Sequence, residues 1–137
     1  MGKDGSGIGG RISGTMGSGI PAMKIKEIFD IPTYSEKYPR WKLSVDLSGV
    51  RYQIYITWNQ RIESWFMTIL DIYDRILLGG LRLVPNIKFF EKYRASVSGL
   101  PPGDLVVFDR EGKMETAELT RNNLGSRFVL SYVVGGE

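Results

Sequence analysis

The chain has 137 residues, of which 42% are hydrophobic and 24% charged, and its formal net charge is +3. This length fits one globular domain and is too short for two domains of ordinary size. Cys and His are both absent, which excludes disulfides, thiolate nucleophiles, Cys/His zinc sites and Ser-His-Asp triads, so we expect no enzymatic activity and no cofactor or metal.

Residues 1–20 are rich in glycine and contain eight of the chain's 17 glycines. Such a segment buries too little surface by itself to offset the entropy of ordering it, so we predict an extended arm that partners would hold. Its apolar residues recur every four positions, and the stretch after it adds three more. The candidate contacts with neighbouring proteins are Ile8, Ile12, Met16, Ile20, Ile25, Ile28 and Phe29.

Residues 21–39 are predicted to connect this arm to the domain. Pro21, Pro32 and Pro39 exclude a long helix there. Within this connector, residues 24–29 fit either a short strand or a turn of helix.

The domain itself is predicted to span residues 40–137 and to be mainly β. Residues 41–47 and 51–58 alternate between apolar and polar side chains, and the turn at Ser48-Gly49 joins them into a hairpin. Four further strands are expected at residues 64–72, 76–84, 104–109 and 127–134. Six short strands at this spacing predict a small antiparallel barrel or sandwich.

Two local patterns interrupt the strands. Gly79-Gly80 lies inside the fourth predicted strand and indicates a bulge or a bend. Residues 120–125 begin with Thr and end with Gly, which favours a capped helical turn.

An aromatic cluster lies in residues 86–99, which we expect to form a loop or a short helical turn. Phe89, Phe90 and Tyr93 stand there among Lys, Glu and Arg residues. Aromatic and Arg side chains are typical anchors of protein–protein contacts, so the three aromatics are candidate interface residues. The alternative is that they cover the open end of the β-structure, and the sequence leaves both interpretations open.

Carboxylates offer a weaker signal for chemistry. Asp71, Asp74 and Asp109 each stand at the end of a predicted strand. Asp is an ordinary turn residue at such positions. We therefore expect turns there, and an enzyme that uses Asp, Lys or Tyr alone is the third class of function considered.

A nucleic-acid-binding interpretation is the alternative to a structural one. On the strand 51–58, Tyr55 shares a face with polar residues, and Arg51 and Arg61 lie near it in the sequence. An oligonucleotide-binding barrel stacks bases on such aromatics, so a single-stranded nucleic-acid-binding OB-like barrel is the second hypothesis. Because the charge is spread along the chain, we do not expect nucleic acid as the main partner.

A longer pattern resembles a known family. It comprises RYxIxIxWNxR at residues 51–61, Trp65, ILD at 69–71, LLxGLRLVP at 77–85, LPPGDL at 100–105 and RNNLGSRFxLxY at 121–132. The order and spacing of these pieces resemble the baseplate plug protein family of contractile-tailed bacteriophages, of the cyanophage myovirus type. The resemblance covers roughly residues 40–134 and leaves out the arm.

This resemblance implies a structural protein of the virion, located in the tail baseplate and assembled in the host cytoplasm. It implies other baseplate, hub and tail-tube proteins as partners, together with copies of the chain itself in a symmetric assembly. It transfers no catalytic residues, because the matching positions are core and turn positions. The chain has no run of about 18 apolar residues, so we expect no membrane partner.

Overall fold

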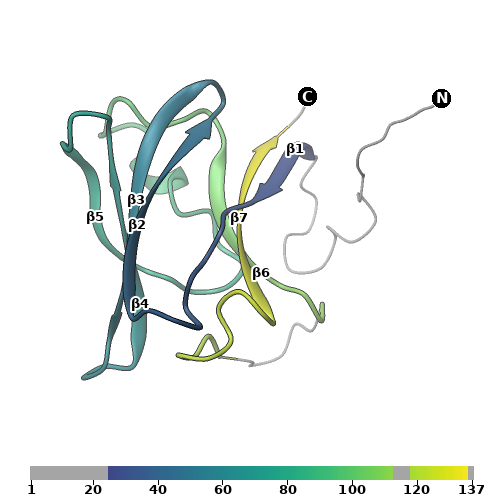
Figure 1. Cartoon of the computed structure of the whole chain (residues 1–137). Helices are drawn as coiled ribbons and strands as arrows, with labels where there is room; N and C mark the ends of the chain where they lie inside the picture. The colour runs from purple at the N-terminus through teal and green to yellow at the C-terminus, as the bar shows by residue number, and fades with distance from the viewer. Residues whose placement is uncertain (1–24, 113–117, 136–137) are drawn as a thin grey trace.

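The computed structural model describes residues 25–112 and 118–135, which form two antiparallel sheets packed face to face (Figure 1). The larger sheet has the order β2-β3-β4-β5, with strands Arg40–Leu47, Val50–Asn59, Ser64–Leu70 and Ile76–Arg82. The smaller sheet has the order β1-β7-β6, with strands Ile25–Asp30, Phe128–Gly135 and Asp104–Asp109. The sandwich prediction is confirmed, and the described strands do not close into a barrel.

The β2-β3 hairpin forms as the sequence predicts. Its two-residue turn, Ser48-Gly49, has positive φ at both residues, 57° and 88°. This geometry matches the right-handed twist of the strands and sets the register, in which Leu47 lies opposite Val50. Every second residue of the hairpin therefore faces the smaller sheet.

The glycine pair in β5 produces the predicted bulge. Met67 pairs with Leu81 and Ile69 pairs with Leu78, so Gly79 and Gly80 together stand opposite a single residue of β4. Gly80 adopts a φ of 65°, and its N–H donates to the Thr68 Oγ1 at 3.1 Å. The bulge bends the edge strand at this point.

The smaller sheet brings together segments from opposite ends of the described chain. Strand β1 pairs with β7 so that Ile25 lies opposite Gly135, and the two strands lie next to each other in Figure 1. The short-strand alternative for residues 24–29 is thus confirmed, and the sheet gains a strand beyond the six expected. Strand β1 makes part of the predicted connector a component of the sandwich.

The core lies between the two sheets and is rich in aromatic side chains. The Trp65 ring lies 5.5 Å from that of Trp41 and 5.2 Å from that of Trp58, in edge-to-face contacts that add to the burial of apolar area. The Trp65 Nε1–H donates to the Thr120 carbonyl at 2.9 Å, which satisfies its polar atom. Fully buried partners come from both sheets: Leu47, Ile54, Ile56, Met67, Ile69, Leu105, Val107 and Leu130.

Residues 120–125 form turns, and the helical turn predicted there is wrong. The Asn123 Oδ1 accepts the Thr120 N–H at 2.7 Å, and Gly125 has a φ of 97°. A side-chain amide that bonds the nearby backbone competes with the hydrogen bonds of a helix. Among the described residues, the helical segment is the 3-10 turn η2, Glu91–Tyr93.

Tyr132 ties the smaller sheet to two turns. Its ring is fully buried. Its hydroxyl accepts the Gly103 N–H at 2.8 Å and shares a hydrogen bond with the Ser48 Oγ at 2.7 Å. One hydroxyl therefore connects β7, the turn before β6 and the β2-β3 turn.

Removing this hydroxyl should destabilise the fold. We expect Tyr132→Phe to lower the free energy of unfolding by about 1–3 kcal/mol, because the buried Gly103 N–H loses its acceptor. Urea denaturation measures the change. Tyr52→Phe is the matched control, since Tyr52 donates to the carbonyl of Gly99, an exposed residue to which water has access. If Tyr52→Phe lowered the free energy of unfolding as much as Tyr132→Phe does, this account would be contradicted.

Candidate protein-interaction surfaces

The arm residues proposed as contacts fall into two groups. Ile8, Ile12, Met16 and Ile20 lie outside the described residues, as does the side chain of Ile25, and their contact role stays a prediction. The described members, Ile28 and Phe29, are half-buried and belong to β1. Phe29 packs against Tyr132, with ring centroids 5.5 Å apart, and Ile28 packs on the opposite face of the smaller sheet.

The aromatic residues of the segment 86–99 also fall into two groups, according to whether they lie only in the core or also line a groove. Phe89 and Phe90 are 4% and 0% exposed and belong to the core. Tyr93 is half-buried and packs against the core from its edge. The structure thus gives Phe90 a packing role, whereas Phe89 and Tyr93 also line a groove. Their role in an interface stays a prediction.

Backbone hydrogen bonds fix the segment that carries these aromatics against the free edge of β6. The Asn86 N–H donates to the Val107 carbonyl at 2.8 Å, and the Phe89 N–H donates to the Leu105 carbonyl at 3.1 Å. The Phe90 N–H donates to the buried Asp104 Oδ1 at 2.7 Å. The segment is therefore a rigid wall rather than a loose loop.

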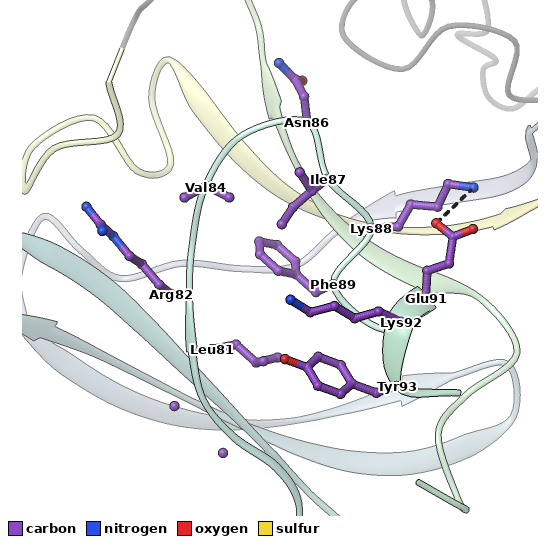
Figure 2. A pocket seen from close by; sticks show the side chains of 12 residues that line it. Leu81, Arg82, Val84, Asn86, Ile87, Lys88, Phe89, Glu91, Lys92 and Tyr93 are labelled. Atoms are coloured by element: carbon purple, nitrogen blue, oxygen red, sulfur yellow. Dashed lines mark ion pairs between the residues drawn. The ribbon is translucent and has the colours of Figure 1, made fainter. Parts of the chain in front are cut away.

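A groove of about 870 Å³ lies between this wall and β5. Figure 2 shows Leu81 of β5 and Tyr93 of η2 pointing toward each other across it, with the Phe89 ring to one side of this pair. Strand β5 is an edge strand with β4 on one side, so backbone groups on its other side face the groove. Apolar walls next to a free strand edge suit an extended peptide.

The rim of the groove is mostly basic. Arg82, Lys88 and Lys92 line it together with one acidic residue, Glu91. The Lys88 Nζ lies 3.9 Å from the Glu91 Oε1, and the Lys92 Nζ lies 5.3 Å from the centroid of the Tyr93 ring. The balance of charge favours an acidic ligand.

A second apolar surface lies where the β2-β3 and β4-β5 hairpins turn. Val50, Ile72 and Ile76 are exposed and line a hollow of about 650 Å³. Next to it Tyr73 is also exposed, with the Arg75 guanidinium 5.5 Å from its ring centroid. Exposed apolar side chains gathered with Arg are typical of contact surfaces. These residues were not among those predicted from the sequence, where the available signal was the Ile72-Tyr73 pair inside an otherwise polar turn.

The residues of the nucleic-acid hypothesis do not converge. Tyr55 is half-buried on the outer face of the larger sheet. Arg51 pairs with Asp46 at 3.3 Å. Arg61 lies in the turn beyond the other end of β3, so along the strand it is about 30 Å from Arg51. The structure therefore assembles no basic and aromatic platform from these three residues.

The three carboxylates stabilise turns. The Arg75 N–H, the Tyr73 N–H and the Arg75 side chain all donate to Asp71 and hold its pKa below the ordinary value. Hydrogen bonds from Gln53 and Lys42 lower the pKa of Asp74 likewise. Asp109 accepts two bonds from Arg127, each 2.9 Å long. Across the described residues, no three His, Cys, Asp or Glu side chains are grouped as a metal site would require.

A comparison with protein families decides the identity of the fold. A family model described as "Cyanophage baseplate Pam3 plug gp18" matches residues 28–135. The chain belongs to this family. The match begins within β1 and so covers strands of both sheets, whereas the resemblance seen in the sequence began near residue 40. No protein of curated function matches the chain.

Membership of the plug family identifies the chain as a structural component of a phage tail baseplate. A structural family favours a non-catalytic role, in agreement with the residue types available. Among the described residues of this plug-family chain, no helix has the length and apolar character needed to cross a membrane.

Asp104, which holds the groove wall in place, should make stability depend on pH. Burial raises its pKa above the ordinary value, against the opposing effects of the Phe90 N–H and Arg94. The folded state therefore holds this proton more tightly than the unfolded state does. The contribution of Asp104 to stability is fully present at low pH and is lost as pH rises through the raised pKa.

We expect Asp104→Asn to remove this dependence, because an amide oxygen still accepts the Phe90 N–H but carries no charge. Urea denaturation at about pH 3 and about pH 7 should show a gain in stability for the variant, relative to the original chain, that appears only at the higher pH. A variant that is less stable at the higher pH alone would contradict the prediction and would show that the ionised carboxylate is stabilising through Arg94.

Proposed function

We propose that this chain joins neighbouring hub and tail-tube proteins in the baseplate of a contractile-tailed phage, through its β-domain and its N-terminal arm. The observation that carries the proposal is the match of residues 28–135 to a baseplate plug family. The role is mechanical and non-enzymatic. Several copies of the chain occupy a symmetric assembly, which forms in the host cytoplasm, and each copy repeats the same contacts.

The contact surface of the β-domain is the groove between β5 and the segment 86–93. Its ligand is an extended segment of a neighbouring baseplate protein that carries both acidic and apolar side chains. The free edge of β5 supplies backbone hydrogen bonds, Leu81 and Phe89 supply apolar contacts, and the basic rim selects acidic residues. A preformed groove costs little entropy to fill, because its wall is already ordered.

Reversing the charge of the rim should weaken incorporation into the baseplate. We expect the double variant Lys88→Glu/Lys92→Glu to reduce the copies per purified virion by about tenfold or more, because like charges then face the ligand. Quantitative mass spectrometry of virions measures the copies. Lys37→Glu/Arg40→Glu is the matched control, because it changes the net charge equally: both residues are exposed and lie before or at the start of β2, at the opposite edge of the larger sheet.

The stability of the isolated double variant should stay close to that of the original chain, since exposed ion pairs contribute little. Normal incorporation of the double variant would contradict the role of the groove. Equal losses for Lys88→Glu/Lys92→Glu and for Lys37→Glu/Arg40→Glu would do the same, because they would show a general effect of net charge.

The arm supplies the second contact in the assembled baseplate. Its apolar residues Ile8, Ile12, Met16 and Ile20 are the proposed anchors on neighbouring subunits. Extended arms bind large areas of a partner from few residues, at an entropic cost that binding must offset.

We expect virions made with a chain that lacks residues 1–20 to contain few or no copies of it. Mass spectrometry of purified particles measures this loss, and circular dichroism of the isolated truncated chain verifies that the β-structure is retained. A scrambled arm of the same composition, in which the four apolar residues no longer recur every fourth position, is the control for length. If the truncated chain were incorporated normally, the arm would have no part in assembly.

A further inference from the structure

The smaller sheet has a second apolar face, turned away from the larger sheet. Leu105 and Val107 of β6 point into the core. Because side chains alternate along a strand, Val106 and Phe108 point to the other side. Val133 of β7 joins them, and these residues form a cluster separate from the main core. We call Val106, Phe108 and Val133 the outer cluster.

The outer cluster is buried, although the core does not cover it. Val106, Phe108 and Val133 are 0%, 7% and 1% exposed. In the larger sheet, by contrast, buried and exposed residues alternate along β2, as expected when one face meets water. All residues of β6 are buried, whichever face they occupy. The outer face of the smaller sheet therefore has a cover of its own.

The described residues supply little of that cover. Among them, Ile28 of β1 is the partly buried apolar side chain that packs against the outer cluster. The polar members of the face have hydrogen-bond partners. The Ser131 Oγ donates to the Asp30 Oδ1 at 2.9 Å, and Asp104, which shares the alternation of Val106 and Phe108, accepts the Phe90 N–H at 2.7 Å. The face is thus apolar with its polar groups satisfied, and it needs an apolar cover from another segment.

We propose that residues 1–24 of the same chain cover the outer cluster in the free subunit. This segment leads directly into β1, which is an edge strand of the same sheet (Figure 1). Fully extended, its 24 residues reach about 80 Å, whereas an eight-residue strand is about 26 Å long. The segment is long enough to cross the whole face.

The apolar pattern of the segment fits this position. Ile8, Ile12, Met16 and Ile20 recur every four positions, which is an even spacing. In an extended chain, positions at even separation project to the same side, so all four side chains form one apolar row, and the outer cluster would contact part of that row. The glycines between them allow the backbone to lie close to the sheet.

This inference concerns the free subunit and does not rest on the proposed baseplate contacts. It gives the four arm residues an intramolecular position before any neighbour is present. The measurements below need only the purified chain, so their failure is distinguishable from a failure of incorporation into virions.

Absence of cysteine from the sequence allows a direct test by thiol labelling. Three single variants are compared, with and without residues 1–20: Val106→Cys on the outer face, Val107→Cys in the core, and Ser44→Cys at an exposed position of β2. In the full chain, we expect the thiols at 106 and 107 to label slowly and the thiol at 44 rapidly. Removal of the arm should accelerate labelling at 106 by about tenfold or more and leave 107 protected.

Rapid labelling at 106 in the full chain would overturn the proposal, and so would slow labelling there in the truncated chain, because each shows that the arm is not the cover. Protection at 106 that appears only as the protein concentration rises would also overturn it, since a second copy would then supply the cover.

A second measurement keeps the full chain and so does not depend on the fold of the truncated one. Four double variants are made, each combining Val106→Cys with a cysteine at one arm position: Ile8, Ile12, Met16 or Ile20. Each protein is oxidised under dilute conditions. We expect at least one pair to form an intramolecular disulfide, seen as a cross-linked monomer by mass spectrometry, and no disulfide when Ser44→Cys replaces Val106→Cys. The proposal would be overturned if no arm cysteine formed a disulfide with the cysteine at 106 or at 44. It would also be overturned if disulfides formed equally with 106 and with 44, or only between two chains.

Discussion

Strand β7 has to be covered on both of its faces, and the rest of the structure depends on this constraint. Its inner side chains complete the core against the larger sheet, and its outer ones form part of the outer cluster. Its two neighbours, β1 and β6, come from distant parts of the chain. The smaller sheet therefore forms only when the beginning and the end of the described chain meet, and such non-local contacts carry a large loop-closure cost before they contribute stability.

A few buried polar groups connect this sheet to the parts of the molecule that face partners. The Tyr132 hydroxyl reaches two turns, and Asp104 holds the segment that forms one wall of the groove. Arg94 adds bonds to the carbonyls of Pro101 and Gly103, which set the turn ahead of β6. Because the Tyr132 hydroxyl and the Asp104 carboxyl are buried and paired in a low-dielectric setting, they favour one arrangement of the wall over alternatives. The shape of the groove is thus a consequence of the core.

The sequence predicted the larger sheet well because its signals are local. Alternation in β2 and β3, the turn at Ser48-Gly49 and the glycine pair of β5 each act within a few residues. The smaller sheet was predicted less completely. Strand β1 carries no clear alternation and forms because β7 offers it an edge, while Val106 and Phe108 are apolar on a face that local patterns assign to solvent. The aromatics at 89 and 90 are buried because the segment 86–93 folds against β6, a contact that spacing alone does not reveal.

The pairing of Ile25 with Gly135 has a practical consequence for labelling and imaging. Both ends of the described chain leave the molecule at one corner, so a fluorescent or affinity fusion at the C-terminus shares that corner with the entry of the N-terminal segment. A bulky fusion there stands beside the start of β1, whereas an epitope inserted in the turn between β3 and β4, at residues 60–63, stands at another edge of the molecule. In a ring of identical copies, tags at the shared corner mark a single circle, and its radius reports how the subunits are oriented.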